Sequence, residues 1–143
     1  MKYALIIIGL IIIWVGIIFV IAPEKSGIAN KKLLEPKTSD IDSVTIIVAP
    51  REISENLDSW EFKIEMNTHS YDLKENLVSI STLIIDEKNS YKPIGWLGDP
   101  TGGHHREGIL KFNQVEFPTR SIELVISGIG GEGERRFKWL IAP

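Results

Sequence analysis

An uninterrupted apolar segment at the N-terminus most constrains what this chain can fold into. No charged residue occurs in residues 3–22. A helix rises about 1.5 Å per residue, so about twenty residues cover about 30 Å, the thickness of the hydrocarbon core of a bilayer. The segment ends at Pro23 and Glu24. We therefore predict a transmembrane anchor over residues 1–23, with residues 3–22 in contact with the lipid bilayer.

A cleavable signal peptide is the alternative interpretation of this segment. Such peptides have an apolar core of about 7–15 residues, followed by a cleavage site of small residues. The apolar core here is longer, and Val20, Ile21 and Ala22 before Pro23 make a poor cleavage site. The sequence favours a retained single-pass anchor and leaves the cleaved signal open.

The orientation of the anchor follows less directly from the charges. Lys2 precedes the apolar segment, whereas Lys25, Lys31, Lys32 and Lys37 follow it. A count of positive charges therefore puts the longer side in the cytoplasm. A short N-terminal tail followed by an exported domain is nevertheless a common arrangement, and we expect the domain to be extracytoplasmic.

Composition excludes several classes of protein. The 143 residues carry a formal net charge of −3, so the basic surface that nucleic-acid binding needs is absent. The chain has no cysteine, which excludes disulfides, thiolate metal sites and a cysteine nucleophile. The length suits one ordinary domain with an appendage.

The pattern of the remaining chain predicts a spacer and then an all-β domain. Residues 24–42 are polar and are expected to be a linker. In residues 43–143 apolar side chains recur with a period of two, most clearly where Trp60, Phe62, Ile64 and Met66 alternate with polar residues. The predicted strands cover residues 44–49, 60–67, 77–85, 91–96, 109–112, 122–126 and 137–141.

About seven short strands separated by turn residues favour one fold class. The pattern is typical of an immunoglobulin-like antiparallel sandwich, with a small barrel as second choice. Without a disulfide, hydrophobic packing must stabilise the domain. The large side chains expected in the core are Trp60, Phe62, Trp96, Phe112, Phe137 and Trp139.

The segment 95–108 has the densest cluster of unusual residues, including His104, His105 and Arg106. The third histidine, His69, follows the clearest strand. Loops distant in sequence meet at the same end of a sandwich, and imidazole suits copper or zinc. His69, His104 and His105 are therefore candidate ligands of a copper or zinc ion. The favoured alternative is structural: glycines make a tight loop, Arg106 pairs with a carboxylate, and the histidines bond backbone groups.

The same residues carry a resemblance to a family. Trp96-x-Gly98 and Gly102-Gly103-His104-His105-Arg106-x-Gly108-x-Leu110-x-Phe112, with Asn67-Thr68-His69-Ser70, form its pattern. The domain from Trp60 onward resembles an uncharacterised family of bacterial membrane-anchored or lipoprotein-type exported proteins, in which an aspartate is more common at the position of Asn67. The resemblance implies export and a β fold, and it implies no reaction.

No catalytic motif is present, and we expect no enzyme activity and no bound cofactor. His69, Ser70 and Asp72 lie too close in sequence for an ordinary triad, and neither G-x-S-x-G nor a Walker motif occurs. The sequence predicts a binding or interaction module at the cell envelope, with a protein partner. Its expected contact loop contains Trp96, Asp99 and Arg106. A metal-binding or metal-delivery domain is the alternative.

Overall fold

The structure, a computed structural model, describes residues 34–54, 56–115 and 119–141. The predicted anchor, residues 1–23, and most of the predicted linker lie outside these residues. Within the described ranges, no helix has the length and apolar character needed to cross a membrane.

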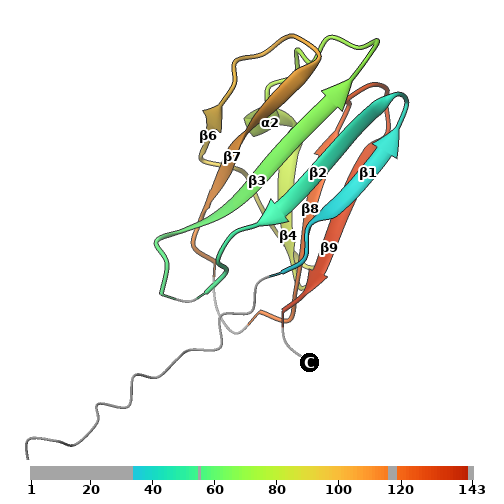
Figure 1. The fold of residues 1–143 in the computed structure, drawn as a ribbon. Helices are drawn as coiled ribbons and strands as arrows, with labels where there is room; N and C mark the ends of the chain where they lie inside the picture. The colour runs from blue at the N-terminus through green and yellow to red at the C-terminus, as the bar shows by residue number, and fades with distance from the viewer. Residues whose placement is uncertain (1–33, 55, 116–118, 142–143) are drawn as a thin grey trace, which may run out of the picture. The chain divides into compact units, whose positions relative to one another are not determined.

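The described residues form two antiparallel sheets, which confirms the predicted all-β class (Figure 1). The first sheet has five strands, in the order β1 (Lys37–Ile41), β2 (Val44–Pro50), β3 (Ser59–Thr68), β7 (His105–Asn113) and β6 (Gly95–Gly98). The second sheet has four, in the order β5 (Asn89–Tyr91), β4 (Ser81–Ile85), β8 (Ser121–Ser127) and β9 (Glu134–Leu140).

The core forms where the inward side chains of the two sheets meet. β3 shows why: its alternating residues place one set of side chains inside and leave Lys63 exposed. The Phe62 ring contacts Phe112 from the neighbouring strand and Trp139 from the second sheet. Five of the six predicted core aromatics are buried, namely Trp60, Phe62, Phe112, Phe137 and Trp139. Trp96 is half-buried and packs against this core.

The predicted strand over residues 77–85 is wrong in its first half. Residues Leu77–Ile80 form a single helical turn, α2, and β4 begins only at Ser81. The Asn76 side chain accepts a hydrogen bond from the Val78 N–H at 3.0 Å, which caps this turn. The cap gives the backbone an alternative to strand pairing that the apolar pattern does not reveal.

The predicted strand over residues 91–96 is divided between the two sheets. β5 ends at Tyr91 in the second sheet, and β6 begins at Gly95 in the first. Pro93 lies between them and has no N–H to donate to a ladder. The chain therefore crosses from one sheet to the other where one continuous strand was expected.

One strand was not predicted, and another is longer than predicted. β1 occupies Lys37–Ile41, inside the range predicted as a linker, and pairs with β2 through a tight turn. Asp42 and Ser43 adopt positive φ angles of 51° and 63° in this turn. β7 begins at His105, four residues before the predicted strand over 109–112.

Four connections gather at one end of the sandwich, which we call the loop end. They are residues 42–43, the segment between β3 and β4, residues 99–104 and residues 128–133. β1 begins at the opposite end, where β9 finishes (Figure 1). The described chain therefore starts at the end of the domain that is farthest from these four connections.

Candidate functional site

Arg106 lies inside the domain rather than in a contact surface. It pairs with Met66 on the inward face of the first sheet, and only 2% of it is exposed. Its Nη1 donates hydrogen bonds to the carbonyl oxygens of Leu73 at 3.0 Å and Glu75 at 2.9 Å. Burial lowers the pKa of the guanidinium below its usual value. Arg106 thus holds the segment after β3 against β7, and it is not available to a partner.

Trp96 covers this buried arginine. The guanidinium carbon of Arg106 lies 5.7 Å from the centre of the Trp96 ring, within cation–π range. The ring rests on Gly98 and Gly108, where an added Cβ would lie 2.8 Å and 2.6 Å from its Cζ2 atom. The Trp96 Nε1–H donates to the Asp99 carbonyl at 2.8 Å. The two glycines are therefore required by packing against the indole.

Asp99 also serves the structure of its own hairpin. Its Oδ2 accepts a hydrogen bond from the Glu107 N–H at 2.8 Å, and its own N–H donates to the Glu107 carbonyl at 2.9 Å. These bonds close the β6–β7 pairing at the loop end. All three residues that the sequence assigned to the contact loop, Trp96, Asp99 and Arg106, thus make intramolecular contacts that hold this hairpin.

The loop between β6 and β7 is fixed by the segment that follows β3. Gly102 and Gly103 adopt φ angles of +104° and +84°, a region that favours glycine. The Gly102 N–H donates to the Leu73 carbonyl at 2.7 Å, and the Leu73 N–H donates to the Gly103 carbonyl at 2.9 Å. Two connections far apart in sequence are therefore joined by backbone hydrogen bonds.

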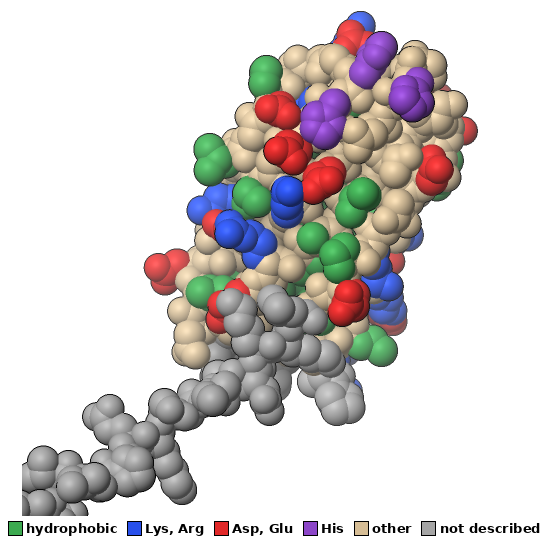
Figure 2. Space-filling model, viewed as in Figure 1, with side chains coloured by type: hydrophobic (Ala, Val, Ile, Leu, Met, Phe, Trp, Pro, Cys, Tyr) green, Lys and Arg blue, Asp and Glu red, His purple; other side chains and the backbone are tan. Residues whose placement is uncertain are grey.

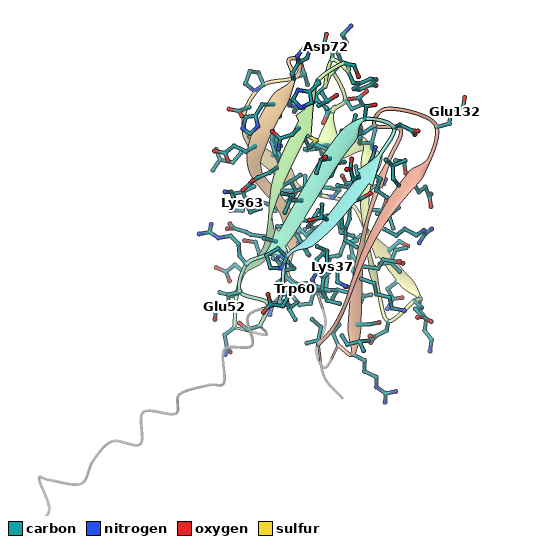
Figure 3. The ribbon with its side chains drawn as sticks, turned by 45° about the vertical axis from the view of Figure 1, so that its right-hand side comes forward. Lys37, Glu52, Trp60, Lys63, Asp72 and Glu132 are labelled. Atoms are coloured by element: carbon teal, nitrogen blue, oxygen red, sulfur yellow. The ribbon has the colours of Figure 1, made fainter. Side chains whose placement is uncertain are left out.

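Asp72 completes this junction from the tip of the loop end (Figure 3). Its Oδ1 accepts a hydrogen bond from the Gly103 N–H at 2.7 Å. This bond, together with the nearby Lys74 ammonium, lowers the pKa of the Asp72 carboxyl. The glycine pair of the motif is thus held in place by a carboxylate thirty-one positions earlier in the chain.

The three histidines remain at the surface. His69, His104 and His105 are all exposed, and Figure 2 shows histidine side chains gathered at the loop end. The His105 Nδ1 lies 2.6 Å from Asn67 Oδ1, and the Thr68 N–H donates to the His104 carbonyl at 2.9 Å. The structure therefore positions the backbone of these residues and leaves their rings accessible.

A ready-formed metal site is not seen at this end. In the part of the chain that the structure describes, no group of three or more histidine, cysteine, aspartate or glutamate side chains is arranged to hold a metal ion. The predicted copper or zinc site of His69, His104 and His105 would need movement of these side chains. It stays a prediction.

Sequence reasoning missed a polar cluster under the loops. The Tyr71 hydroxyl donates to a carboxylate oxygen of Glu75, which raises the pKa of Tyr71. The other oxygen of Glu75 and the Nε of Arg106 are buried, and neither has a hydrogen-bond partner among the described residues. Tyr71 and Glu75 are four residues apart, but Arg106 joins them only when β7 pairs with β3, and no local pattern reveals that approach.

Arg135 is a second buried arginine that the sequence did not reveal. Only 3% of it is exposed, and burial lowers its pKa. Its guanidinium donates to the carbonyl oxygens of Ile41 at 2.8 Å, Val44 at 3.0 Å and Ile129 at 3.0 Å. It thereby ties the β1–β2 turn to the β8–β9 loop at the same end of the domain.

Comparison with known proteins finds no matching family model, no matching curated protein and no matching solved structure.

Proposed function

We propose that the domain is an immunoglobulin-like sandwich. In the constant-type immunoglobulin fold, strands A, B, E and D form one sheet and strands C, F and G form the other. If β2 is taken as strand A, the order β2-β3-β7-β6 matches the first sheet and the order β4-β8-β9 matches the second. β1 and β5 are then additional edge strands. This agreement of strand order is the support for the proposal.

The second part of the proposal is a tether at the end opposite the loop end. The apolar residues 3–22 have the length of a membrane-spanning helix. The described chain begins at the end of the sandwich away from the four connections (Figure 1). An anchor preceding Leu34 would thus be joined to the sandwich through the end at which β1 begins, and we place the sandwich on the extracytoplasmic side.

The function that the geometry supports best is a binding module for a protein partner at the cell envelope. We assign its contact surface to His69, His104 and His105, with Asn67 beside them; this set is called the histidine surface. The observation that carries this proposal is that these side chains are exposed, while hydrogen bonds between two loops hold their backbone in place. Rigid presentation of exposed side chains lowers the entropy cost of binding.

Site-specific photo-cross-linking in cells tests this contact surface. A photoreactive amino acid replaces His104 in the full-length chain, and a matched variant carries it at Glu52, which is exposed at the opposite end. A discrete adduct of higher mass is expected at His104 and not at Glu52. Equal adducts at both positions, or none at His104, would exclude the histidine surface as the contact.

The tether is tested separately by fractionation. Full-length protein should stay in the membrane pellet after an alkaline wash, because a spanning helix is not removed by salt or pH. Release into the soluble fraction with a new N-terminus near Pro23 would show that the apolar segment is a cleaved signal.

Metal binding is the second candidate, favoured by the presence of all three histidines at one end (Figure 2). A zinc or copper titration of the full-length chain tests it, with His104→Ala as the variant and Glu52→Ala as the control. Tight binding that only His104→Ala abolishes would support a metal site. Equal binding by all three proteins, or none, would exclude it.

A further inference from the structure

The four edge strands of the sandwich differ in how they are protected. Exposed sheet edges invite pairing with another chain, and proteins usually guard them with charges or very short strands. β1 contains Lys37 and Asp40, β5 has only three residues, and β9 carries four charged residues. β6, with the sequence Gly-Trp-Leu-Gly, has no charge at all. It lies at the outer margin of the first sheet (Figure 1).

The most exposed large apolar side chain of the described residues lies in the middle of this unguarded strand. Leu97 is 72% exposed and points to the outer face of the sheet, beside Ile109 of β7. Ile94, just before the strand, is also exposed. β6 therefore has one edge that pairs with no other described strand, and it carries a solvent-exposed apolar side chain.

The backbone pairing of β6 shows which groups are free to bond another strand. The Asp99 N–H donates to the Glu107 carbonyl, and Gly98 pairs with Gly108. Because antiparallel partners alternate, Leu97 exchanges its hydrogen bonds with Ile109. The N–H and C=O groups of Trp96 and Gly98 then point away from β7. No backbone partner for them is found among the described residues.

A second copy of the same strand satisfies these free groups in one register. If Trp96 lies opposite the partner's Gly98, two-fold symmetry also places Gly98 opposite the partner's Trp96. In each of these two pairs, the free N–H and C=O groups of both residues bond each other. Placing Gly98 opposite itself would put Trp96 opposite the partner's Pro100, which has no N–H. Placing Trp96 opposite itself would put Gly98 opposite the partner's Ile94, whose N–H already donates to Lys111.

The same register brings the exposed leucines together. Leu97 then lies opposite its own copy in a non-hydrogen-bonded pair, where Cα atoms are about 4.5 Å apart and side chains are closest. The most exposed apolar side chain of the described residues is thus buried against itself. We propose that two copies of this chain associate through antiparallel pairing of their β6 strands, centred on Leu97, to form a continuous ten-stranded sheet.

The interface is small, so its stability depends on concentration. A four-residue strand buries far less than the roughly 1,200 Å² of a stable interface. Confinement of both copies to one membrane raises their effective concentration. In that respect alone the pairing rests on the proposed tether, and the alkaline wash reports on the tether independently.

Disulfide cross-linking of the full-length chain in its membrane tests the pairing. The native chain has no cysteine, so a single introduced cysteine is unambiguous. Leu97→Cys places two thiols across the two-fold axis, at a Cα separation of about 4.5 Å that a disulfide spans. Leu140→Cys is the matched control, because Leu140 is 68% exposed on another edge strand.

With a mild oxidant such as diamide, Leu97→Cys is expected to form several-fold more dimer than Leu140→Cys. Ile94→Cys should behave like the control, because Ile94 lies opposite the partner's Pro100 in this register. Equal cross-linking at positions 97 and 140 would indicate random collision and overturn the proposal, as would its absence at 97. Cross-linking at position 94 that exceeds that at 97 would overturn the register.

A second measurement does not depend on cysteine chemistry. Two differently tagged full-length copies, co-expressed and solubilised gently, should co-purify as wild type. Leu97→Lys places two ammonium groups opposite each other and should lower the recovered partner several-fold, while Leu140→Lys should not. Equal recovery from both variants would show that the copies do not meet through β6.

Discussion

The two glycine-rich connections at the loop end, residues 99–104 and 128–133, are held in the same way. Each precedes a strand whose second residue is a buried arginine, Arg106 in β7 and Arg135 in β9. Each arginine donates to backbone carbonyls of a neighbouring connection, Leu73 and Glu75 in one case and Ile41 and Val44 in the other. The glycines and arginines therefore serve the architecture in both loops.

The two connections differ in what they leave exposed. Residues 99–104 end in His104 and are followed by His105, whereas residues 128–133 expose Glu132 (Figure 3). They also differ in their attachment, because the first loop is bonded to the segment after β3 and the second is bonded mainly to Arg135. A conspicuous sequence cluster can thus consist largely of structural residues, and the candidate contact residues are those whose side chains remain exposed.

The largest expected effect comes from removing either arginine. Arg135 donates to three carbonyls and to Ser39 Oγ, whereas Arg106 donates to two carbonyls. Arg135→Leu removes the donor to three carbonyls, whereas Arg106→Leu removes the donor to the Glu75 carbonyl and leaves the Leu73 carbonyl bonded to the Gly102 N–H. We therefore expect Arg135→Leu to lower the free energy of unfolding by about 4 kcal/mol and Arg106→Leu by about 3 kcal/mol. Urea denaturation measures both.

Arg136→Leu is the matched control for this comparison. Arg136 is exposed and forms surface ion pairs with Glu123 and Glu134, which contribute little to stability because solvent screens them. If Arg106→Leu cost no more than Arg136→Leu, the shared role of the two buried arginines would be refuted.

The next effect concerns the glycines on which Trp96 rests. A Cβ at Gly98 would lie 2.3 Å from the Glu107 carbonyl oxygen and 2.5 Å from the Gly108 Cα, both backbone atoms that cannot easily move. Gly98→Ala should therefore cost about 2 kcal/mol of stability. Gly95→Ala, where nothing lies within 4 Å, should change stability by less than about 0.5 kcal/mol. Similar midpoints for the two variants in denaturant would show that the close approach of β6 to β7 at Gly98 does not require glycine.

A smaller, pH-dependent effect is expected from Asp72. Its pKa is lowered in the folded state by the Gly103 N–H and by Lys74. The carboxylate therefore stabilises the fold above the unfolded value of 3.8, and this contribution is lost as the pH falls through the lowered folded value. Asp72→Asn should reduce the loss of stability between pH 5 and pH 2 relative to wild type. Parallel stability–pH curves for the two proteins would contradict the role of Asp72.

The smallest effect on stability is expected at the histidine surface. His69, His104 and His105 are exposed, so alanine at any one of them should change the free energy of unfolding by less than about 0.5 kcal/mol. If alanine lowered the free energy of unfolding by more than about 1.5 kcal/mol in urea melts, the histidines would have a structural role like that of the arginines. The first loop would then not differ from the second in presenting residues for contact.

The parts of the fold that could be predicted from sequence are those that depend on local alternation. β3 was expected almost in full, because Trp60, Phe62, Ile64 and Met66 alternate with exposed residues. The helical turn α2 was missed because Asn76 caps it with a single hydrogen bond, which apolar periodicity does not register. The division of residues 91–96 was missed because a change of sheet depends on tertiary packing.

The sequence singled out the cluster at residues 95–108, but the roles of its residues could not be assigned from sequence. Side chains alternate between the two faces of β7, so His105 points outward and Arg106 points inward. The sequence did not reveal this arrangement, because it did not show that the strand begins at His105. The partners of Arg106 and Asp99 lie on other segments or across the hairpin. Spacing in one sequence does not reveal such contacts.

Hydrogen exchange at the glycines of the two loops tests the central claim most directly, namely that residues 99–104 are a rigid support for the histidines. The Gly102 and Gly103 amides donate to Leu73 and Asp72, whereas the Gly131 and Gly133 amides have no acceptor among the described residues. Slow exchange at Gly102 and Gly103, with fast exchange at Gly131 and Gly133, is the predicted result for the full-length chain. Equally fast exchange at all four glycines would show that both loops are mobile and that the histidine surface is not preformed.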